Sequence, residues 1–454
     1  MTSSTLAVEP RGNGLDAPVP RYTSFPTATQ FDGSVDDAAL RAWLAAHDGA
    51  RPISLYVHVP YCRHLCWYCG CHTRAASRNE PLAAYADTVI AHLHQLAAWL
   101  GSRAPVKHLH FGGGTPSILV PEGFHRIMAA VDELFAVSPG AELAIELDPR
   151  TVTRSMAGEL ASAGINRVSL GVQTFDEIVQ TAINRVQGYD RVAESVAAVR
   201  AAGIDAVSVD LMYGLPNQTA ASVADTVDAV AGLAPDRLAV FGYAHVPWAK
   251  PHQRQLDAAA LPGTQARLDQ ARTARERLQA AGYRAIGIDH FARPGDGLAR
   301  AHAAGTLRRN FQGYTDDPCS WLLGAGASAI SALPQGYAQA SPHLRTYRHG
   351  VRDGGLGVHK GIAVGAEDAC RRSVIATLMT YQAADLAACA RAHGYAPELF
   401  ADAWAALEPL ERDGLVKRHG WRVTLAPDAW PWTRVVCSAF DPYFAPAHGH
   451  SRAV

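Results

Sequence analysis

The chain has 454 residues, of which 48% are hydrophobic, a length and composition that suit two domains, one of them large. Its 41 basic and 42 acidic side chains give a net charge of −1, so the whole chain carries no general electrostatic attraction to nucleic acid or anionic membranes. No apolar run is long enough to span a bilayer, and residues 1–20 lack the apolar stretch of a signal peptide. We therefore expect a cytoplasmic protein in a reducing compartment, with no nucleic-acid partner and no membrane span.

The first part of the chain is predicted to be an extension ahead of the main fold. Residues 1–20 are polar, contain glycine and proline, and are expected to be disordered. Residues 21–27 form a compact polar and aromatic segment, for which a surface strap is the simplest structural role. Residues 36–47 have the spacing of a short amphipathic helix.

Four of the eight cysteines follow the first predicted strand within ten residues. The apolar run 53–59 indicates a buried strand, and Pro60 ends it, so the cysteines lie on the next loop. Cys62, Cys66 and Cys69 have the spacing C-x3-C-x2-C, and Cys71 completes a Cys-Gly-Cys sequence. Three thiolates on one short loop can converge on one soft metal centre.

Two kinds of metal site compete for this loop. A four-iron cluster held by three thiolates leaves one iron open for a ligand, whereas a structural zinc site needs four closed ligands. Cys71 is available as a fourth ligand, although it follows Cys69 more closely than zinc pairs usually do. The spacing favours the open iron–sulfur site and leaves zinc or inert thiols as alternatives. The scattered cysteines at 319, 370, 389 and 437 are expected to be ordinary buried thiols.

From residue 50 onward, strand patterns alternate with helix patterns. Such alternation predicts parallel pairing with right-handed crossovers, hence either an incomplete barrel of six units or a doubly wound sheet, which periodicity cannot separate. The predicted strands are 53–59, 106–111, 142–147, 167–172, 206–212 and 237–243, with an extra one at 284–288. The predicted helices are 82–100, 124–135, 191–202, 221–233 and 264–281.

Polar or glycine-rich residues follow every one of these six strands, which is hard to explain by a packed core. In parallel barrels the chemistry takes place at the carboxyl ends of the strands. Three consecutive glycines at 112–114 allow a ligand to approach the backbone, since glycine has no side chain in the way. Besides the cysteines, the set is Gly113, Gly114, Thr115, Glu146, Gln173, Arg185, Asp210 and Ala244. The sequence therefore predicts one binding site at this end of the fold.

The segment 287–335 is rich in glycine and small residues and contains Asn-Phe-Gln-Gly-Tyr at 310–314. A glycine-rich loop pair on the barrel edge explains the glycines but not this string. An unsatisfied buried amide costs about 1–3 kcal/mol, so Gln312 is not expected to be simple core. We predict that Phe311 and Gln312 reach into the barrel mouth and help to close it.

The composition changes near residue 347. Residues 367–379 and 397–413 predict amphipathic helices, and 414–425 predicts a β-hairpin. Helices followed by such a hairpin suggest a winged-helix-like module. Because the chain is not basic, a lid or platform for the barrel is favoured over DNA binding.

An ordered set of strings along residues 21–445 resembles the oxygen-independent coproporphyrinogen III oxidases (dehydrogenases), a family of radical S-adenosylmethionine (SAM) enzymes. The strings include Arg-Tyr-Thr-Ser-Phe-Pro-Thr, the cysteine loop, Gly-Gly-Gly-Thr-Pro, Gly-Val-Gln-Thr-Phe and Asn-Phe-Gln-Gly-Tyr. The resemblance decides the fold class: α/β, a partial (β/α)6 TIM-type radical SAM barrel with a mostly helical, winged-helix-like C-terminal domain. The implied division is an N-terminal extension (1–48), the barrel with its closing segment (49–345) and the C-terminal domain (346–454).

The resemblance also implies roles for individual residues. Cys62, Cys66 and Cys69 would hold a 4Fe-4S cluster, with Cys71 turned away from the iron. The family holds two SAM molecules. Residues implied for the first are Tyr56, Gly113, Glu146 and Ile330, and for the second Tyr68, Gly114, Thr115, Gln173, Arg185, Asp210 and Ala244. Those implied in catalysis are Tyr56, Cys71, Glu146, Phe311 and Gln312, and the segment 21–27 resembles an element near the substrate.

The implied reaction is the anaerobic decarboxylation of two propionates of coproporphyrinogen III to vinyl groups, giving protoporphyrinogen IX for haem synthesis. A 5′-deoxyadenosyl radical would take the β-hydrogen, and CO2 and one electron would leave. The expected partners are the substrate and an unidentified electron donor and acceptor, and a monomer is expected. Two rival functions stay open, a haem chaperone of the same fold and a radical SAM methyltransferase. The chaperones lack the fourth cysteine, so Cys71 favours the oxidase.

Overall fold

The computed structural model describes residues 18–445. Most of the segment 1–20, where disorder is predicted, lies outside these residues, as does 446–454. Within 18–445 no helix combines the length and the apolar character that a membrane crossing requires.

The fold is built on one twelve-stranded sheet, and six consecutive neighbours in it are the six strands predicted from the sequence. They run parallel to one another in chain order. These strands are β1 (Ile53–Val59), β4 (Pro105–Gly113), β5 (Ala136–Leu147), β6 (Arg167–Gln173), β7 (Ala206–Tyr213) and β8 (Arg237–Gly242). The sheet ends at β16 and β9 and does not close, so the predicted partial barrel is confirmed.

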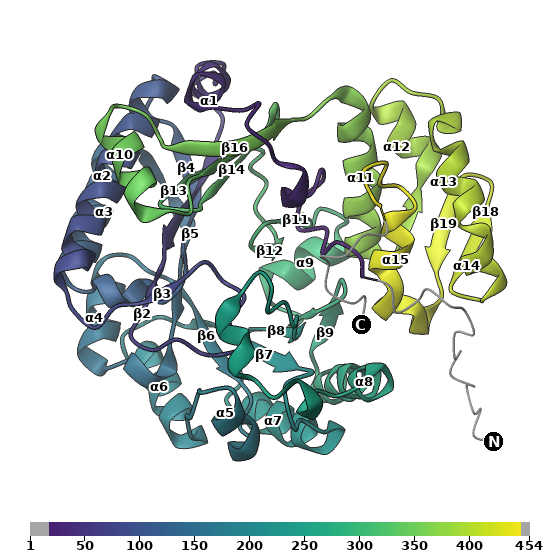
Figure 1. Ribbon diagram of the computed structural model, residues 1–454, viewed down its shortest axis with the longest axis horizontal. Helices are drawn as coiled ribbons and strands as arrows, with labels where there is room; N and C mark the ends of the chain where they lie inside the picture. The colour runs from purple at the N-terminus through teal and green to yellow at the C-terminus, as the bar shows by residue number, and fades with distance from the viewer. Residues whose placement is uncertain (1–17, 446–454) are drawn as a thin grey trace.

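Helices cover the outer face of the parallel strands (Figure 1). They are α2 (Glu80–Leu100), α3 (Glu122–Leu134), α4 (Arg154–Ser162), α6 (Tyr189–Ala201), α7 (Ala220–Gly232) and α8 (Thr264–Ala280). Val89 and Leu93 of α2 belong to one core with Leu55 and Val57 of β1, and all four are buried. Burial of this apolar layer holds each helix on the sheet. Helix α4 and the short α5 (Glu177–Ala182) were not predicted.

The large sheet continues on both sides of the parallel strands. Next to β1 lies β13 (Leu322–Ala325), followed by the antiparallel strands β14 (Ile330–Leu333), β15 (Gly336–Ala340) and β16 (Val358–Ala363). Helix α10 (Leu344–Arg352) packs on α2. The sequence suggested a loop pair here, because glycines hide the strand pattern. Gly324 is needed in β13, since a Cβ there would lie 2.7 Å from the carbonyl oxygen of Ile330.

Beyond β8, the chain adds a short antiparallel edge and a separate hairpin. The edge consists of β10 (His290–Ala292) and β9 (Arg284–Ile286), the latter confirming the extra strand. The hairpin consists of β11 (Arg308–Asn310) and β12 (Gly313–Thr315), with Phe311 and Gln312 at its turn. Between these two features lies α9 (Gly297–Ala303).

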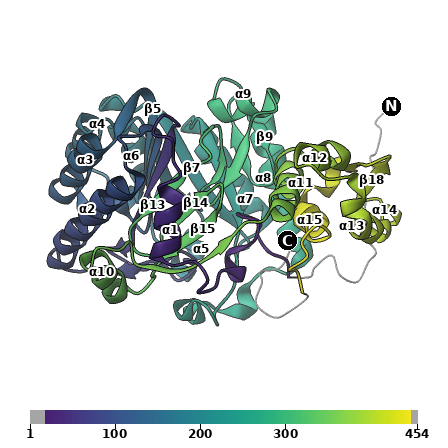
Figure 2. The same ribbon diagram turned by 90° about the horizontal axis from the view of Figure 1, so that it is seen from above.

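The C-terminal part has the predicted winged-helix-like form and lies beside the sheet (Figures 1 and 2). Its three-stranded antiparallel sheet has the order β17-β19-β18. The elements are α11 (Ala366–Tyr381), β17 (Ala383–Asp385), α12 (Leu386–Ala392), α13 (Ala401–Ala406), α14 (Glu408–Arg412), β18 (Val416–His419), β19 (Arg422–Leu425) and α15 (Thr433–Ser438). The single helix predicted over 397–413 is wrong: it is three short helical pieces, the last of which begins beside Pro409.

The N-terminal segment joins the two parts of the molecule. Val19, Tyr22 and Phe25 belong to the core of the C-terminal part. The predicted helix at 36–47 is α1 (Asp37–Leu44), which begins at an Asp36 cap. The division into three domains stays a prediction; the structure adds that β16, beyond residue 345, pairs with β15.

Candidate active site

A cavity of about 620 Å³ opens at the carboxyl ends of the parallel strands, and we call it the mouth cavity. Its volume lies within the range of about 300–1,000 Å³ that small-molecule sites occupy. The predicted residues that line it are Cys62, Cys66, Cys69, Cys71, Tyr68, Gly113, Gly114, Thr115, Glu146, Gln173, Arg185, Asp210 and Ala244. The topology therefore brings together residues from most of the predicted strand ends.

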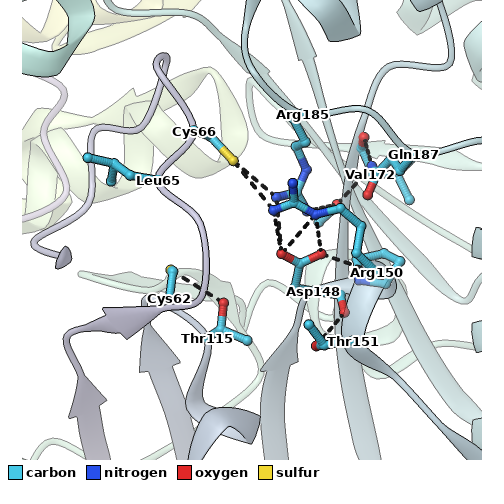
Figure 3. A network of polar contacts seen from close by, with 12 residues as sticks. Cys62, Leu65, Cys66, Thr115, Asp148, Arg150, Thr151, Val172, Arg185 and Gln187 are labelled. Atoms are coloured by element: carbon cyan, nitrogen blue, oxygen red, sulfur yellow. Dashed lines mark hydrogen bonds and ion pairs between the residues drawn. The ribbon is translucent and has the colours of Figure 1, made fainter. Parts of the chain in front are cut away.

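The predicted cluster cysteines share this cavity, but the thiols of Cys62 and Cys66 each face a polar partner of their own (Figure 3). Cys62 Sγ lies 3.4 Å from Thr115 Oγ1, and Cys66 Sγ lies 3.4 Å from Arg185 Nη1. Among residues 18–445, no three His, Cys, Asp or Glu side chains are gathered closely enough to hold a metal ion as they stand. The expectation that the three thiols converge on one point is therefore not met by the present side-chain orientations.

Cys69 and Cys71 interact with each other. The hydrogen bond between their side chains lowers the pKa of Cys69 to about 7 and raises the pKa of Cys71 well above its usual value. Cys69 is thus the thiol of this pair that ionises more easily, as a metal ligand must. Cys71 also lines the cavity, so its role is not fixed by its position.

An acidic side chain that the sequence analysis did not single out lies between two arginines at the end of β5 (Figure 3). Asp148 accepts hydrogen bonds from Arg150 Nε at 3.0 Å and Nη2 at 2.7 Å, and Arg185 Nη1 lies 3.5 Å from its carboxylate. The Asp148 side chain is only 10% exposed. Both guanidinium groups also reach Cys66 Sγ. This cation pair faces the cysteine loop and suits an anionic group bound there.

A short segment after β8 holds the cysteine loop by its backbone, and the sequence analysis missed it. Lys250 Nζ donates to Cys71 O at 3.0 Å, His252 Nε2 lies 2.7 Å from Cys69 O, and Gln253 Nε2 donates to Tyr68 O at 3.0 Å. The available signal was composition, because Lys250 is one of very few lysines in this arginine-rich chain. These contacts orient the loop toward the cavity.

The glycines after β4 allow the protein's own atoms to pack closely. A Cβ on Gly113 would lie 2.6 Å from the His58 ring, and one on Gly114 would lie 2.5 Å from Tyr61 O. The Gly113 N–H donates to Glu146 Oε2 at 3.1 Å. Although burial acts to raise it, hydrogen bonds from His110 and Gly113 hold the pKa of Glu146 below its usual range. Glu146 is therefore an anion beside the glycine turn.

Gln173, at the end of β6, has a left-handed backbone with φ of 69°. This conformation costs a non-glycine residue about 1–2 kcal/mol. Gln173 lines the mouth cavity with its neighbour in space, Arg185. Strain at a predicted site residue is consistent with a binding role rather than a structural one.

A second cavity of about 200 Å³, which we call the inner cavity, lies deeper among the strands. It shares Glu146, Ser169 and Asp210 with the mouth cavity, so the two adjoin. Gln312 lines this inner cavity and not the mouth cavity, into which it was predicted to reach. Phe311 lines neither: its ring packs edge-on against Phe31 and Tyr337, outside both cavities. Adjacent residues of the β11–β12 turn point different ways, and neither lines the mouth cavity. The expectation that both reach into the mouth is therefore not met, and a role of Gln312 in catalysis stays a prediction.

Tyr56 and Ile330 are the other two predicted residues that do not line the mouth cavity. Tyr56 stacks on His110 with the rings 5.9 Å apart, and its hydroxyl lies 2.9 Å from His58 Nδ1. Ile330 lies on β14, across Gly324 of β13 from Tyr56. Both therefore lie on the sheet beside the cavity. The N-terminal segment does reach it, because Val19 and Arg21 line the mouth.

An Asp210→Asn variant is expected to be about 1–2 kcal/mol more stable than the unchanged chain near pH 7 without ligands. Burial, and then the charge of Glu146, raise the pKa of Asp210 to about 6, so its ionised form weakens the fold. The full shift would correspond to about 3 kcal/mol, which cavity water reduces. Below the unfolded pKa the carboxyl group of Asp210 is protonated in both the folded and the unfolded chain. The difference in stability between the variant and the unchanged chain should therefore vanish below about pH 4. Urea denaturation from pH 4 to 8 measures it; a pH-independent difference would contradict the argument.

The donor set fits an iron–sulfur cluster in its chemistry. Three soft thiols lie on one loop that lines one cavity, and two guanidinium groups face that loop to balance negative charge. Gathering the thiols requires rotation of side chains, above all of Cys66 away from Arg185. No further donor from the described residues completes a closed zinc site with them as they stand.

Comparison with known proteins gives a consistent result. A model of the radical SAM superfamily matches residues 56–230. An oxygen-independent coproporphyrinogen III oxidase of Bradyrhizobium diazoefficiens is 46% identical, with 96% of this chain and 97% of that protein aligned. The one from Paracoccus denitrificans is 42% identical, with 97% of each covered. The solved structure of coproporphyrinogen III oxidase from Escherichia coli, described as a radical SAM enzyme, has a TM-score of 0.89 at 37% identity, covering 93% of this chain and 98% of that one.

Proposed function

This chain belongs to the oxygen-independent coproporphyrinogen III oxidases of the radical SAM superfamily, and from that membership we propose the reaction that it catalyses. The substrate is coproporphyrinogen III, and two of its propionates become vinyl groups, giving protoporphyrinogen IX. Each propionate loses one hydrogen atom from its β-carbon, one electron and CO2. The proposed cofactors are a 4Fe-4S cluster and two SAM molecules.

One observation carries this proposal. The mouth cavity joins the cysteine loop to the polar strand ends, so one cavity offers both cluster thiols and nucleoside-binding groups. A Cys-Gly-Cys with Cys71 in that same space favours the oxidase over a haem chaperone, whose relatives lack the fourth cysteine. All eight cysteines are free thiols, which agrees with the proposed cytoplasmic location.

The side chains that line the mouth cavity are proposed to bind the cluster and the two SAM molecules. Cys62, Cys66 and Cys69 would hold the cluster, which, when bound, supplies the electron that cleaves SAM to an organic radical. Glu146, fixed by His110 and the Gly113 N–H, would bind the hydroxyl or amino groups of one SAM. Asp210 lines the same space and would serve the second.

Positioning the substrate requires cationic groups at the mouth. Arg21 lines the mouth and donates to Gly242 O at 3.0 Å, which fixes its side chain near the cavity. A guanidinium group there can bind a propionate carboxylate at two points. Desolvation lowers the pKa of Arg21, although nearby Asp289 opposes this shift. A carboxylate ligand beside it would favour the charged form of Arg21.

The proposed function is tested by an anaerobic assay of the reconstituted full chain with coproporphyrinogen III, SAM and dithionite. We expect two CO2 released per porphyrinogen and a product lighter by two carboxyl groups and two hydrogen atoms. Tight haem binding without SAM cleavage would instead favour the chaperone, and a product that gains carbon would favour a methyltransferase. Equilibrium binding of SAM should give two equivalents per chain, and a single site would contradict that part.

A Gln312→Ala variant should keep its iron and its melting temperature but release CO2 at least about tenfold more slowly. Gln312 is an exposed residue that lines the inner cavity, as Asp210 does, so it does not support the core. A displacement of about 1 Å at the reacting atoms can cost a hundredfold in rate. The measurement is CO2 released per SAM cleaved. Phe311→Leu serves as the control, since its ring packs elsewhere; unchanged CO2 release in Gln312→Ala would refute the role.

A further inference from the structure

A basic groove lies on the surface between α10, the N-terminal end of α2 and the strand β3 (Arg74–Ala75). Five arginines line it, Arg74, Arg78, Arg345, Arg348 and Arg352, against the single carboxylate of Asp87. The chain as a whole is balanced, with 41 basic and 42 acidic residues. The groove is therefore a local concentration of positive charge that overall composition does not explain.

Within residues 18–445 most of the positive charge of the groove is not neutralised, and among its five arginines only Arg78 has an ion pair, with Glu80 at 4.0 Å. Arg74, Arg345 and Arg352 are exposed and form no ion pair within residues 18–445. Arg348 donates to Pro81 O at 3.3 Å, a neutral acceptor, and its Nε is buried without a partner. The one carboxylate, Asp87, is paired with Arg126 at 2.6 Å. An anionic partner would thus meet nearly uncompensated guanidinium groups.

The floor of the groove is hydrogen-bonded directly to the cysteine loop. Strand β3 pairs with β2 (Tyr61–Cys62), and the Ala76 N–H donates to Cys62 O at 2.8 Å. Arg63, next to Cys62, donates to Ala76 O at 3.2 Å and to Asn79 Oδ1 at 2.7 Å. Ala76 lines the groove, while Cys62 lines the mouth cavity. The hydrogen bond from Ala76 to Cys62 therefore connects the floor of the groove to a cysteine of the loop.

The groove and the mouth cavity share no lining residue. The β2–β3 pair contributes to both, since Cys62 of β2 lines the cavity and Arg74 and Ala75 of β3 line the groove. A partner seated in the groove would leave the mouth free. An electron could then enter from the groove while SAM and substrate occupy the cavity.

We propose that the basic groove docks an acidic electron-transfer protein, one that carries a flavin or an iron–sulfur group. This inference rests on the proposed function, which needs one electron for each SAM cleaved. Complementary charge accounts for the choice of partner, because steering between opposite charges raises the association rate of redox proteins. Transient complexes of electron-transfer proteins bury small interfaces, and a surface groove of this kind can supply such an interface.

The test compares two reductants on the reconstituted full chain, an acidic flavodoxin in its reduced form and dithionite, which needs no docking site. The variant is Arg345→Glu with Arg352→Glu, two exposed residues outside the mouth cavity. At low ionic strength we expect flavodoxin-driven SAM cleavage to fall at least about tenfold. Dithionite-driven cleavage should stay within about twofold. Added salt should slow the unchanged chain and have little effect on the variant.

The matched control reverses two exposed arginines of the C-terminal part, Arg391→Glu with Arg422→Glu, and should leave both rates unchanged. Binding of oxidised flavodoxin, measured by fluorescence anisotropy, gives a readout that needs no turnover. It should weaken about tenfold in the groove variant only, and this result decides the matter if dithionite activity also falls. Wild-type affinity in the groove variant would overturn the proposal.

Two further outcomes separate this inference from its alternatives. A short RNA or vesicles of anionic lipid that bind as tightly as flavodoxin, with the same sensitivity to the groove variant, would overturn the assignment to a redox partner. Failure of the proposed function is a different result, namely no CO2 release with dithionite. Flavodoxin-dependent SAM cleavage can be measured whichever product forms.

Discussion

A Cys62→Ser variant is expected to lose most of its iron and to release CO2 from coproporphyrinogen III at least about 100-fold more slowly. The serine hydroxyl does not ionise near neutral pH and is a harder ligand than a thiolate. Even removal of a group that only supports a metal ligand costs about 10–100-fold, so loss of a ligand should cost more. Iron content and the visible absorbance of the anaerobically reconstituted chain measure the first effect, and the CO2 assay measures the second.

The matched control is Cys389→Ser, a partly buried cysteine of α12 that lies outside the mouth cavity. It should keep full iron and full activity. Full iron in the Cys62→Ser protein would instead show that Cys62 does not hold the cluster. The Ala76 N–H donates to the backbone carbonyl of residue 62, which the substitution does not change. The hydrogen bond between the cysteine loop and the basic groove therefore stays in place.

An Asp148→Ala variant is expected to lower the free energy of unfolding by about 3–5 kcal/mol. Removal of one partner from a buried ion pair leaves the other charges uncompensated, and that cost is of this size. Here two cations depend on one carboxylate, since Arg150 and Arg185 both face Asp148. Urea denaturation of the full chain at pH 7 measures the loss. A loss below about 1 kcal/mol would mean that cavity water solvates the arginines.

The pH dependence of this variant checks the cause of its instability. Although burial acts to raise it, the hydrogen bond from Arg150 and the charge of Arg185 hold the pKa of Asp148 below its usual value. A lowered acid pKa stabilises the fold above the unfolded pKa, and this stability is lost as the pH falls through the folded pKa. The deficit of Asp148→Ala should therefore be largest near neutrality and shrink on acidification.

A second aspartate provides the matched control for Asp148. Asp176 caps helix α5, where its side chain accepts from the N–H groups of Ile178 and Val179. Asp176→Ala should cost only about 1 kcal/mol, the usual value of a helix cap. A loss as large as that of Asp148→Ala would show that deletion of any aspartate in this region disrupts the fold.

Pattern alone placed the parallel strands with small errors. The predicted strand 53–59 coincides with β1, and the others differ mainly by added residues at their ends, as where β5 starts at Ala136. Buried parallel strands are continuous apolar runs bounded by polar turns, and both features are local in sequence. For the same reason, the polar residues at the strand ends could be predicted from the sequence, and most of them line the mouth cavity.

Other features could not be predicted because they arise from contacts between distant residues. Strands β13 to β16 carry many small residues, and their pairing depends on the neighbouring β1 rather than on their own pattern. Lys250, His252 and Gln253 look like ordinary polar residues until the fold brings them to the cysteine loop. Phe311 and Gln312 are adjacent in sequence, but the turn directs them to different places.

The sequence by itself determined the six strand–helix units and the cysteine spacing, because periodicity and motif spacing are properties of short segments. The choice of a partial barrel over a doubly wound sheet came from the resemblance to a known family and not from periodicity. Only the tertiary structure decided which charges meet: Asp148 between its two arginines, Glu146 beside the glycine turn, and five arginines around one surface groove. Electrostatic interactions depend on distance in space, and α10 is more than 250 residues from the cysteine loop along the chain. The physical reason is that folding, and not sequence spacing, sets the distances over which charges act.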